Sequence, residues 1–337
     1  QPVQMQVIEN DKVEIKKVYL GMVMLYEDKK EVIPVIQTTA GLEYLISTKI
    51  KSLIDIDKKT IGFVDLNSSS PMKIDNLSSQ LSQHYTFNPV DLNSPISPEI
   101  DVLLVSGTID SVGDATLSSL RTFLDNGKSV FMSQGRIFTD IQTQQAYPIE
   151  SDIFDFMSEY GLNLQPNLVL DDHCSSVQVQ ERRGIFMMNR PMEYPFFPII
   201  QSFNSDEIVV SDLEQVLPFF PSEIKIDSIL NDKIIAVVEL FKSSNNSGTM
   251  ESNWMLSPDP QQNPFIRMLG QQGKIIAASS KLMNGGELFL ISDSKFLSDE
   301  SGMSVKDNLT FLMNAVDYLA GDEDLIALRS RAITIRP

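Results

Sequence analysis

The chain has 337 residues, a hydrophobic fraction of 42% and one cysteine, and its 27 basic residues stand against 45 acidic ones, a formal charge of −18. This length and composition suit one large or two ordinary globular domains with a sizeable core. The acidity argues against a nucleic-acid partner, because phosphates are repelled without a basic patch. A single cysteine excludes an intramolecular disulfide, and no run approaches the ~18 apolar residues of a membrane span.

The first 40 residues predict an antiparallel β meander. Strand-like segments cover residues 13–18, 19–26 and 31–36, with a charged turn at 27–30. A helix is predicted over residues 42–53, where apolar residues recur on one face. We expect the meander to lie beside a larger sheet or on its edge.

Between residues 60 and 170, short apolar strands alternate with amphipathic helices. The clearest unit runs from Asp101 to Gly135 and contains strand 102–105, a helix between about Asp114 and Gly127, and strand 130–132. This is a βαβ unit with an expected right-handed crossover. Further strands are predicted at 61–66, 85–89 and 168–170, and further helices at 75–84 and 151–160. Such alternation is typical of a doubly wound, mostly parallel α/β sheet.

The pattern changes between residues 174 and 272, where prolines cluster and strand-like pieces are short. Segment 234–241 is the clearest strand there, and we predict a mostly β second lobe. From residue 273 the α/β pattern resumes, with strands at 275–278 and 287–292 and a helix at 305–319. The predicted domains are a β meander at 1–40, an α/β domain at 41–173 and 273–337, and an inserted β lobe at 174–272.

Polar side chains follow several of the predicted strands. In open α/β sheets, ligands bind beyond the carboxyl ends of the strands. The candidate ligand-binding residues are therefore Ser106, Thr108, Ser133, Gln134, Asp171 and Asp293. Strand ends that meet water are polar in any such fold, so the same residues are also compatible with no ligand.

The segment from Phe131 to Gly135 resembles the strand-to-turn position of a nucleophile elbow, with Ser133 as the nucleophile. Only the second glycine of G-x-S-x-G is present, and the only histidines are His84 and His173. A cryptic serine hydrolase that uses Ser133 and His173 stays open as an alternative.

Residues 171–174 read Asp-Asp-His-Cys and combine three kinds of metal ligand. Four consecutive residues cannot readily surround one ion, because neighbours in a strand point to opposite faces. We therefore predict no metal site and regard Cys174 as a structural thiol. Neither G-x-x-x-x-G-K-[ST] nor G-x-G-x-x-G occurs, so we expect no ATP hydrolysis by this chain and no cofactor.

Two segments, Tyr194–Pro198 and Leu217–Pro221, combine aromatic residues with prolines. Aromatic side chains anchor many protein interfaces, and we take Tyr194, Phe196 and Phe197 as candidate partner-binding residues. The alternative is that rigid loops tuck these rings into the core.

Several short motifs follow one another along nearly the whole chain. They are Val18-Tyr19-Leu20-Gly21, Ile33-Pro34, Leu42-Glu43-Tyr44, and residues 101–105 (DVLLV), 168–171 (LVLD), 194–198 (YPFFP), 286–294 (GELFLISDS), 314–322 (NAVDYLAGD) and 329–331 (RSR). In this order they resemble the extracytoplasmic part of GldG-like, gliding-motility-associated ABC transporter auxiliary proteins, which are uncharacterised ABC-type transport system proteins.

The resemblance implies a non-catalytic domain on the extracytoplasmic (periplasmic) face of the inner membrane, acting by protein–protein contacts in a gliding-motility or export complex. Its partners would be the ABC permease and ATPase subunits, and segments flanking this sequence, which begins at Gln1 without a methionine, would anchor it in the membrane. The implied fold is similar to the GIFT and glutamine-amidotransferase-like folds. An amidotransferase would place a cysteine near Ser133, and none is there, so the fold does not bring that activity with it. A domain that binds a small molecule or glycan at the strand ends is the alternative.

Overall fold

The computed structural model describes residues 3–9, 12–18, 20–34, 36, 42–54, 58–67, 71–183, 186–259, 261–263, 265–323 and 325–327. The chain divides into two compact units. The terminal unit comprises Gln1–Lys58 with Asp322–Pro337, and the central unit comprises Lys59–Gly321. The first predicted boundary, at residue 40, lies inside the terminal unit, because the helix that follows belongs with the N-terminal strands.

The terminal unit contains two separate β hairpins and one helix. Strand β1 (Val3–Glu9) pairs with β2 (Lys12–Val18), and β3 (Met22–Tyr26) pairs with β4 (Lys29–Ile33). The predicted continuous meander is therefore wrong, because β2 and β3 belong to different sheets. Helix α1 (Leu42–Ile54) is joined to β4 by Lys49 Nζ and Ser52 Oγ, which donate to the Glu31 carboxylate at 2.8 and 3.1 Å.

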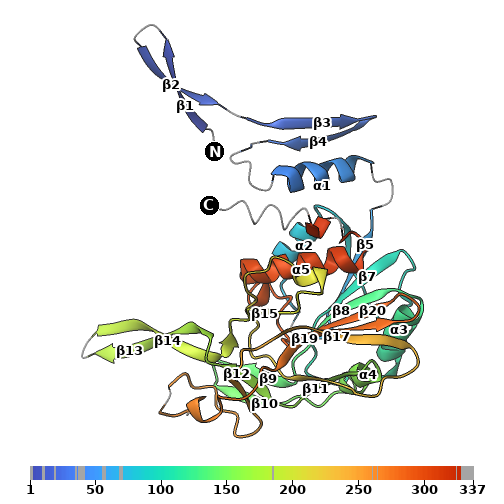
Figure 1. Ribbon diagram of the computed structural model, residues 1–337, viewed down its shortest axis with the longest axis vertical. Coiled ribbons are helices and arrows are strands. Elements are labelled where there is room, and N and C mark those ends of the chain that lie inside the picture. The colour runs from blue at the N-terminus through green and yellow to red at the C-terminus, as the bar shows by residue number, and fades with distance from the viewer. Residues whose placement is uncertain are drawn as a thin grey trace. The chain divides into compact units, whose positions relative to one another are not determined.

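A sheet of ten strands organises the central unit (Figure 1). Its parallel part has the order β6-β5-β7-β8-β20. These strands are β5 (Thr60–Val64), β6 (Thr86–Pro89), β7 (Ile100–Val105), β8 (Ser129–Ser133) and β20 (Glu287–Ile291). The expected mixed α/β fold with a large, mostly parallel sheet is confirmed.

Antiparallel strands extend the sheet beyond β20. Strand β19 pairs with β20, and β16, β17, β11 and β15 continue outward from it. Their bounds are β11 (Leu162–Leu164), β15 (Ser202–Phe203), β16 (Ile224–Ile226), β17 (Ile234–Lys242) and β19 (Ile275–Leu282). Because β16 and β17 belong to the main sheet, residues 174–272 do not form the separate lobe that we predicted.

Successive residues of the central strands point to opposite faces, and each face is covered by helices. Val102, Phe131 and Phe289 pack on one face with α2 (Asp75–Leu81) and α5 (Lys306–Leu319). Leu103, Val130 and Leu288 pack on the other face with α3 (Asp114–Asp125) and α4 (Ile153–Glu159). Burial on both faces explains why these strands read as continuous apolar runs, and it makes the fold doubly wound.

Smaller two-stranded sheets complete the central unit. They are β9 (Ile137–Asp140) with β10 (Gln145–Pro148), β12 (Leu168–Asp171) with β18 (Ser247–Met250), and β13 (Cys174–Arg183) with β14 (Phe186–Pro198). Short 3-10 turns occur at Ile208–Val210, Phe265–Arg267 and Gly302–Ser304. Strand β12, which we expected in the parallel sheet, is instead an antiparallel partner of β18. None of the helices in the described residues is long and apolar enough to cross a membrane.

Candidate functional site

The carboxyl ends of β7, β8 and β20 lie side by side, because these strands are neighbours in the parallel part of the sheet. The residues that follow them form a polar cluster, which we call the strand-end cluster: Ser106, Thr108, Ser133, Gln134 and Asp293. This gathers every predicted ligand-binding residue except Asp171. The exposed fraction of each of these five residues is 2% or less, so none of them faces solvent.

Gln134 joins the loops after β7 and β8. Its Oε1 accepts a hydrogen bond from the Thr108 N–H at 2.7 Å, and its Nε2 donates to the carbonyls of Thr108 and Gly135 at 3.1 and 2.6 Å. Ser106 joins the loop after β5, because its Oγ donates to Asp65 Oδ1 at 2.8 Å. These side chains therefore hold neighbouring loops together and have little capacity left for a ligand.

Ser133 is not placed as a nucleophile. Its hydroxyl is buried and donates to the Asp293 carbonyl oxygen at 2.5 Å, and no hydrogen bond joins it to a histidine in the described part of the chain. The loop at Gly107 packs directly against Ser133. A Cβ at position 107 would lie 2.9 Å from the Ser133 carbonyl oxygen, so there is no room for a side chain between them. A hydrolase needs an accessible nucleophile and a base within hydrogen-bonding reach, and Ser133 has neither here.

Asp293 is the titratable member of the cluster. Its carboxylate accepts the N–H groups of Phe219 at 2.9 Å and Lys295 at 2.8 Å. Burial in the cluster raises its pKa from 3.8 to about 7, and the two backbone donors and the Lys295 charge oppose that shift without cancelling it. The group fixes the loop after β20 to the segment before β16.

Asp171 lies outside the strand-end cluster, at the end of β12. It is buried, and its carboxylate accepts the Ser244 N–H at 2.6 Å, the Ser244 hydroxyl at 2.7 Å and the His173 N–H at 3.0 Å. Burial also raises the pKa of the Cys174 thiol to about 11, so this thiol is unreactive at neutral pH. The described residues contain no group of three or more His, Cys, Asp or Glu side chains that could hold a metal ion.

The candidate partner-binding rings are not on the surface. Tyr194, Phe196 and Phe197 are 9% exposed or less and pack edge-to-face with Phe220 and Phe265 in an aromatic core. The Tyr194 hydroxyl donates to the Leu256 carbonyl at 2.6 Å. The prediction of an exposed docking element is therefore wrong for these residues, because the proline-containing strand turns its aromatic side chains inward.

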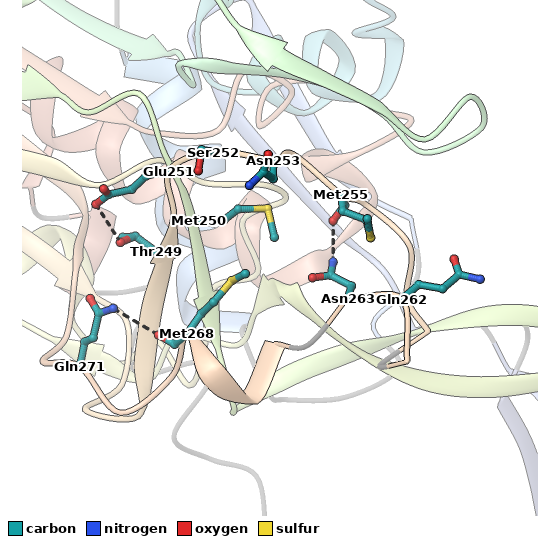
Figure 2. Close-up of a pocket in the computed structure, with 10 residues that line it drawn as sticks. All are labelled: Thr249, Met250, Glu251, Ser252, Asn253, Met255, Gln262, Asn263, Met268 and Gln271. Atoms are coloured by element: carbon teal, nitrogen blue, oxygen red, sulfur yellow. Dashed lines mark hydrogen bonds between the residues drawn. The ribbon is translucent and has the colours of Figure 1, made fainter.

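A pocket of about 530 Å³ opens where β18 ends, and no sequence motif had indicated it (Figure 2). We call it the methionine pocket. Its lining residues are Thr249, Met250, Glu251, Ser252, Asn253, Met255, Gln262, Asn263, Met268 and Gln271. Figure 2 shows the side chains of Met250 and Met268 directed toward each other across it. The clustering of methionines at 250, 255 and 268 is the only signal in the sequence that could have suggested it.

A second pocket of about 660 Å³ lies between the loop after β6 and helix α3. Apolar side chains dominate it, including those of Leu92, Ile96 and Phe123. Its one basic side chain, Lys128, already donates to the Asp101 carboxylate at 3.1 Å. The one charged side chain of this pocket is therefore already in an ion pair, whereas Glu251 of the methionine pocket is in none among the described residues.

A family model described as an ABC-type uncharacterized transport system matches residues 58–315. An uncharacterized protein of Borreliella burgdorferi strain B31 is 24% identical over 350 residues, covering 95% of this chain and 66% of that protein. The chain thus spans just under two thirds of its relative's length.

Solved structures show the fold alone. The N-terminal domain of mmIFT52 is similar at a TM-score of 0.51 with 11% identity, over 77% of this chain and 96% of that one. PurLQS from Thermotoga maritima is similar at a TM-score of 0.38 with 10% identity, over 78% of this chain and 99% of that one, a similarity too low to support an inference.

Proposed function

Because the chain belongs to the family of ABC-type uncharacterized transport systems, we propose that it is a non-catalytic auxiliary component of such a system and acts by protein contacts. Its partners would be the permease and ATPase subunits. The resemblance to GldG-like proteins supports a role in gliding motility or export, a GIFT-like fold, and a location at the periplasmic face of the inner membrane with an anchor outside this sequence.

The strand-end cluster is the observation that carries the non-catalytic part of the proposal. In enzymes with wound α/β sheets, reactive side chains stand at the carboxyl ends of the strands, where substrate can reach them. Here Ser133, Gln134 and Asp293 are buried, and their side chains are hydrogen-bonded to backbone groups of neighbouring loops. Side chains that connect the strands in this way stabilise a rigid body, which suits a recognition component.

The hairpin of β13 and β14, which we call the hairpin arm, is the contact surface that we favour. Figure 1 shows it extending away from the rest of the central unit. Its base is fixed, because Tyr194 of β14 belongs to the aromatic core. Farther out, Met188 is 54% exposed and Arg190 is also exposed. A rigid base with an exposed apolar and basic outer part favours docking to another subunit.

Copurification of the full-length protein from its native membranes tests this proposal. We expect tagged protein to recover a permease and an ATPase subunit after mild cross-linking, and Met188→Asp combined with Arg190→Glu to lower that recovery several-fold. Met283→Asp is the matched control, since Met283 is 71% exposed on the turn between β19 and β20. Recovery of neither subunit by the unaltered protein would overturn the proposal, and equal losses in both variants would exclude the hairpin arm as the contact.

The proposed location has its own test. Protease added to spheroplasts should digest the full-length protein, and protease added to intact cells should leave it whole. Protection in spheroplasts, with digestion only after the membrane is lysed, would place this chain on the cytoplasmic side and contradict the proposal.

A further inference from the structure

The methionine pocket has walls that the fold holds in place. The Gln271 N–H donates to the Ser247 carbonyl at 2.9 Å, which ties the segment before β19 to the start of β18. Gly248 allows the close packing that follows, because a Cβ there would lie 1.7 Å from the Met268 carbonyl oxygen. On the far side, Asn263 Nδ2 donates to the Met255 carbonyl at 2.5 Å and fixes the opposite wall. The pocket is therefore formed before any ligand arrives.

The charge of the lining selects against anions. None of the ten lining residues is basic, and Glu251 is the one ionisable side chain among them. Glu251 is exposed, and within the described residues its carboxylate has one hydrogen bond, from Thr249 Oγ1 at 3.4 Å. Figure 2 shows it at the end of the pocket opposite Met255 and Gln262. A cationic group at that end would complete an ion pair.

The remaining groups suit a peptide. The side-chain amides of Asn253 and Gln262 are exposed and make no hydrogen bond to the other described residues, so they can pair with the N–H and C=O of a peptide group. Methionine side chains are flexible and polarizable, and they adapt to apolar side chains of different shapes. The volume of about 530 Å³ falls in the usual range for ligand sites.

From these three features we propose that the methionine pocket binds a short peptide. Its positively charged amino terminus would pair with Glu251, its backbone would bond to the amides of Asn253 and Gln262, and an apolar side chain would lie against the exposed Met255 and the half-buried Met268. This inference goes beyond the proposed auxiliary function, and either of the two can fail without the other.

Trp254, the only tryptophan in the chain, lies between two lining residues and reports on the site. The probe is an equimolar pool of tripeptide amides with free amino termini, titrated into the purified chain while the fluorescence of Trp254 is recorded. The counter-probe is the same pool after N-acetylation. We expect a saturable change with the first pool and an affinity at least tenfold lower with the second.

Glu251→Gln keeps the shape of the side chain and removes its charge, so it should weaken binding of the free-amine pool by a similar factor. Glu150→Gln is the matched control on an exposed glutamate away from the pocket, and it should bind as the unaltered chain does. Absence of saturable binding, equal affinity for the two pools, or unchanged binding by Glu251→Gln would each overturn the proposal. Recovery of transporter subunits tests the proposed function and does not depend on these results.

Discussion

The stability of the central unit should fall as the pH rises from about 4 to about 7, because of Asp293. Its pKa is 3.8 ordinarily and about 7 in the folded chain, since burial disfavours the carboxylate. Between these two values the folded state holds a proton that the unfolded state has lost. The free energy of unfolding is therefore highest below pH 4 as far as this group is concerned, and it declines toward pH 7.

The size of the effect follows from the shift. One pKa unit corresponds to about 1.4 kcal/mol, so this carboxyl alone should remove about 2 to 3 kcal/mol of unfolding free energy between pH 5 and pH 7.5. Glu287, whose pKa burial raises to about 6, adds a smaller change of the same sign. Asp293→Asn removes the ionisable group, so its unfolding free energy should depend less steeply on pH, although it starts lower because one backbone donor loses its acceptor.

Urea unfolding of the whole chain at pH 5 and pH 7.5, followed by Trp254 fluorescence, measures the difference, because this tryptophan lies in the central unit. Asp155→Asn is the control, since it makes the same substitution at an exposed position. The reasoning would be refuted if the unaltered chain were equally stable at both pH values, or if Asp293→Asn kept the full pH dependence.

Two further substitutions test the interpretation of buried polar groups. Gln134→Ala should lower the unfolding free energy by about 3 kcal/mol, because it leaves buried backbone groups of Thr108 and Gly135 unpaired. The control, Gln142→Ala, lies on an exposed turn and should change the unfolding free energy little. Equal urea midpoints for the two variants would contradict this. Tyr194→Phe should lower the unfolding free energy by about 1 kcal/mol in the same assay, because it removes the hydrogen bond to the Leu256 carbonyl. It should leave copurification of the transporter subunits unchanged. Reduced recovery by a stably folded variant would instead make Tyr194 part of the interface.

The closed strand-end cluster also bears on how this family uses its fold. The side chains at the sheet's carboxyl edge form hydrogen bonds with neighbouring loops, and Gly107 and Gly135 allow those loops to approach closely. Open pockets occur elsewhere, at the end of β18 and beside α3. A search for ligands of this protein is therefore better directed to those pockets than to the edge where wound α/β sheets usually bind.

The amino-acid sequence by itself determined the central α/β body. Every side chain of an apolar run such as 102–105 is buried only when both faces of the strand are covered. The spacing of Leu117, Leu120 and Phe123 places these side chains on one buried face only if the segment is a helix. Gly127 marked the end of that helix because its φ of 77° suits a residue without a Cβ. These signals are local, so they could be read without knowing what each segment contacts.

Only the tertiary structure decided which strands pair and which polar groups remain free. Strand β12 has the composition of a core strand, yet its partner β18 lies about eighty residues away, and nothing near β12 in the chain specifies that pairing. The burial of Tyr194 and Ser133 was likewise not specified by nearby sequence, because tyrosine and serine occur both at surface sites and in cores. A side chain's exposure and hydrogen bonds depend on residues brought near it by the fold, and that information is not local to its own segment.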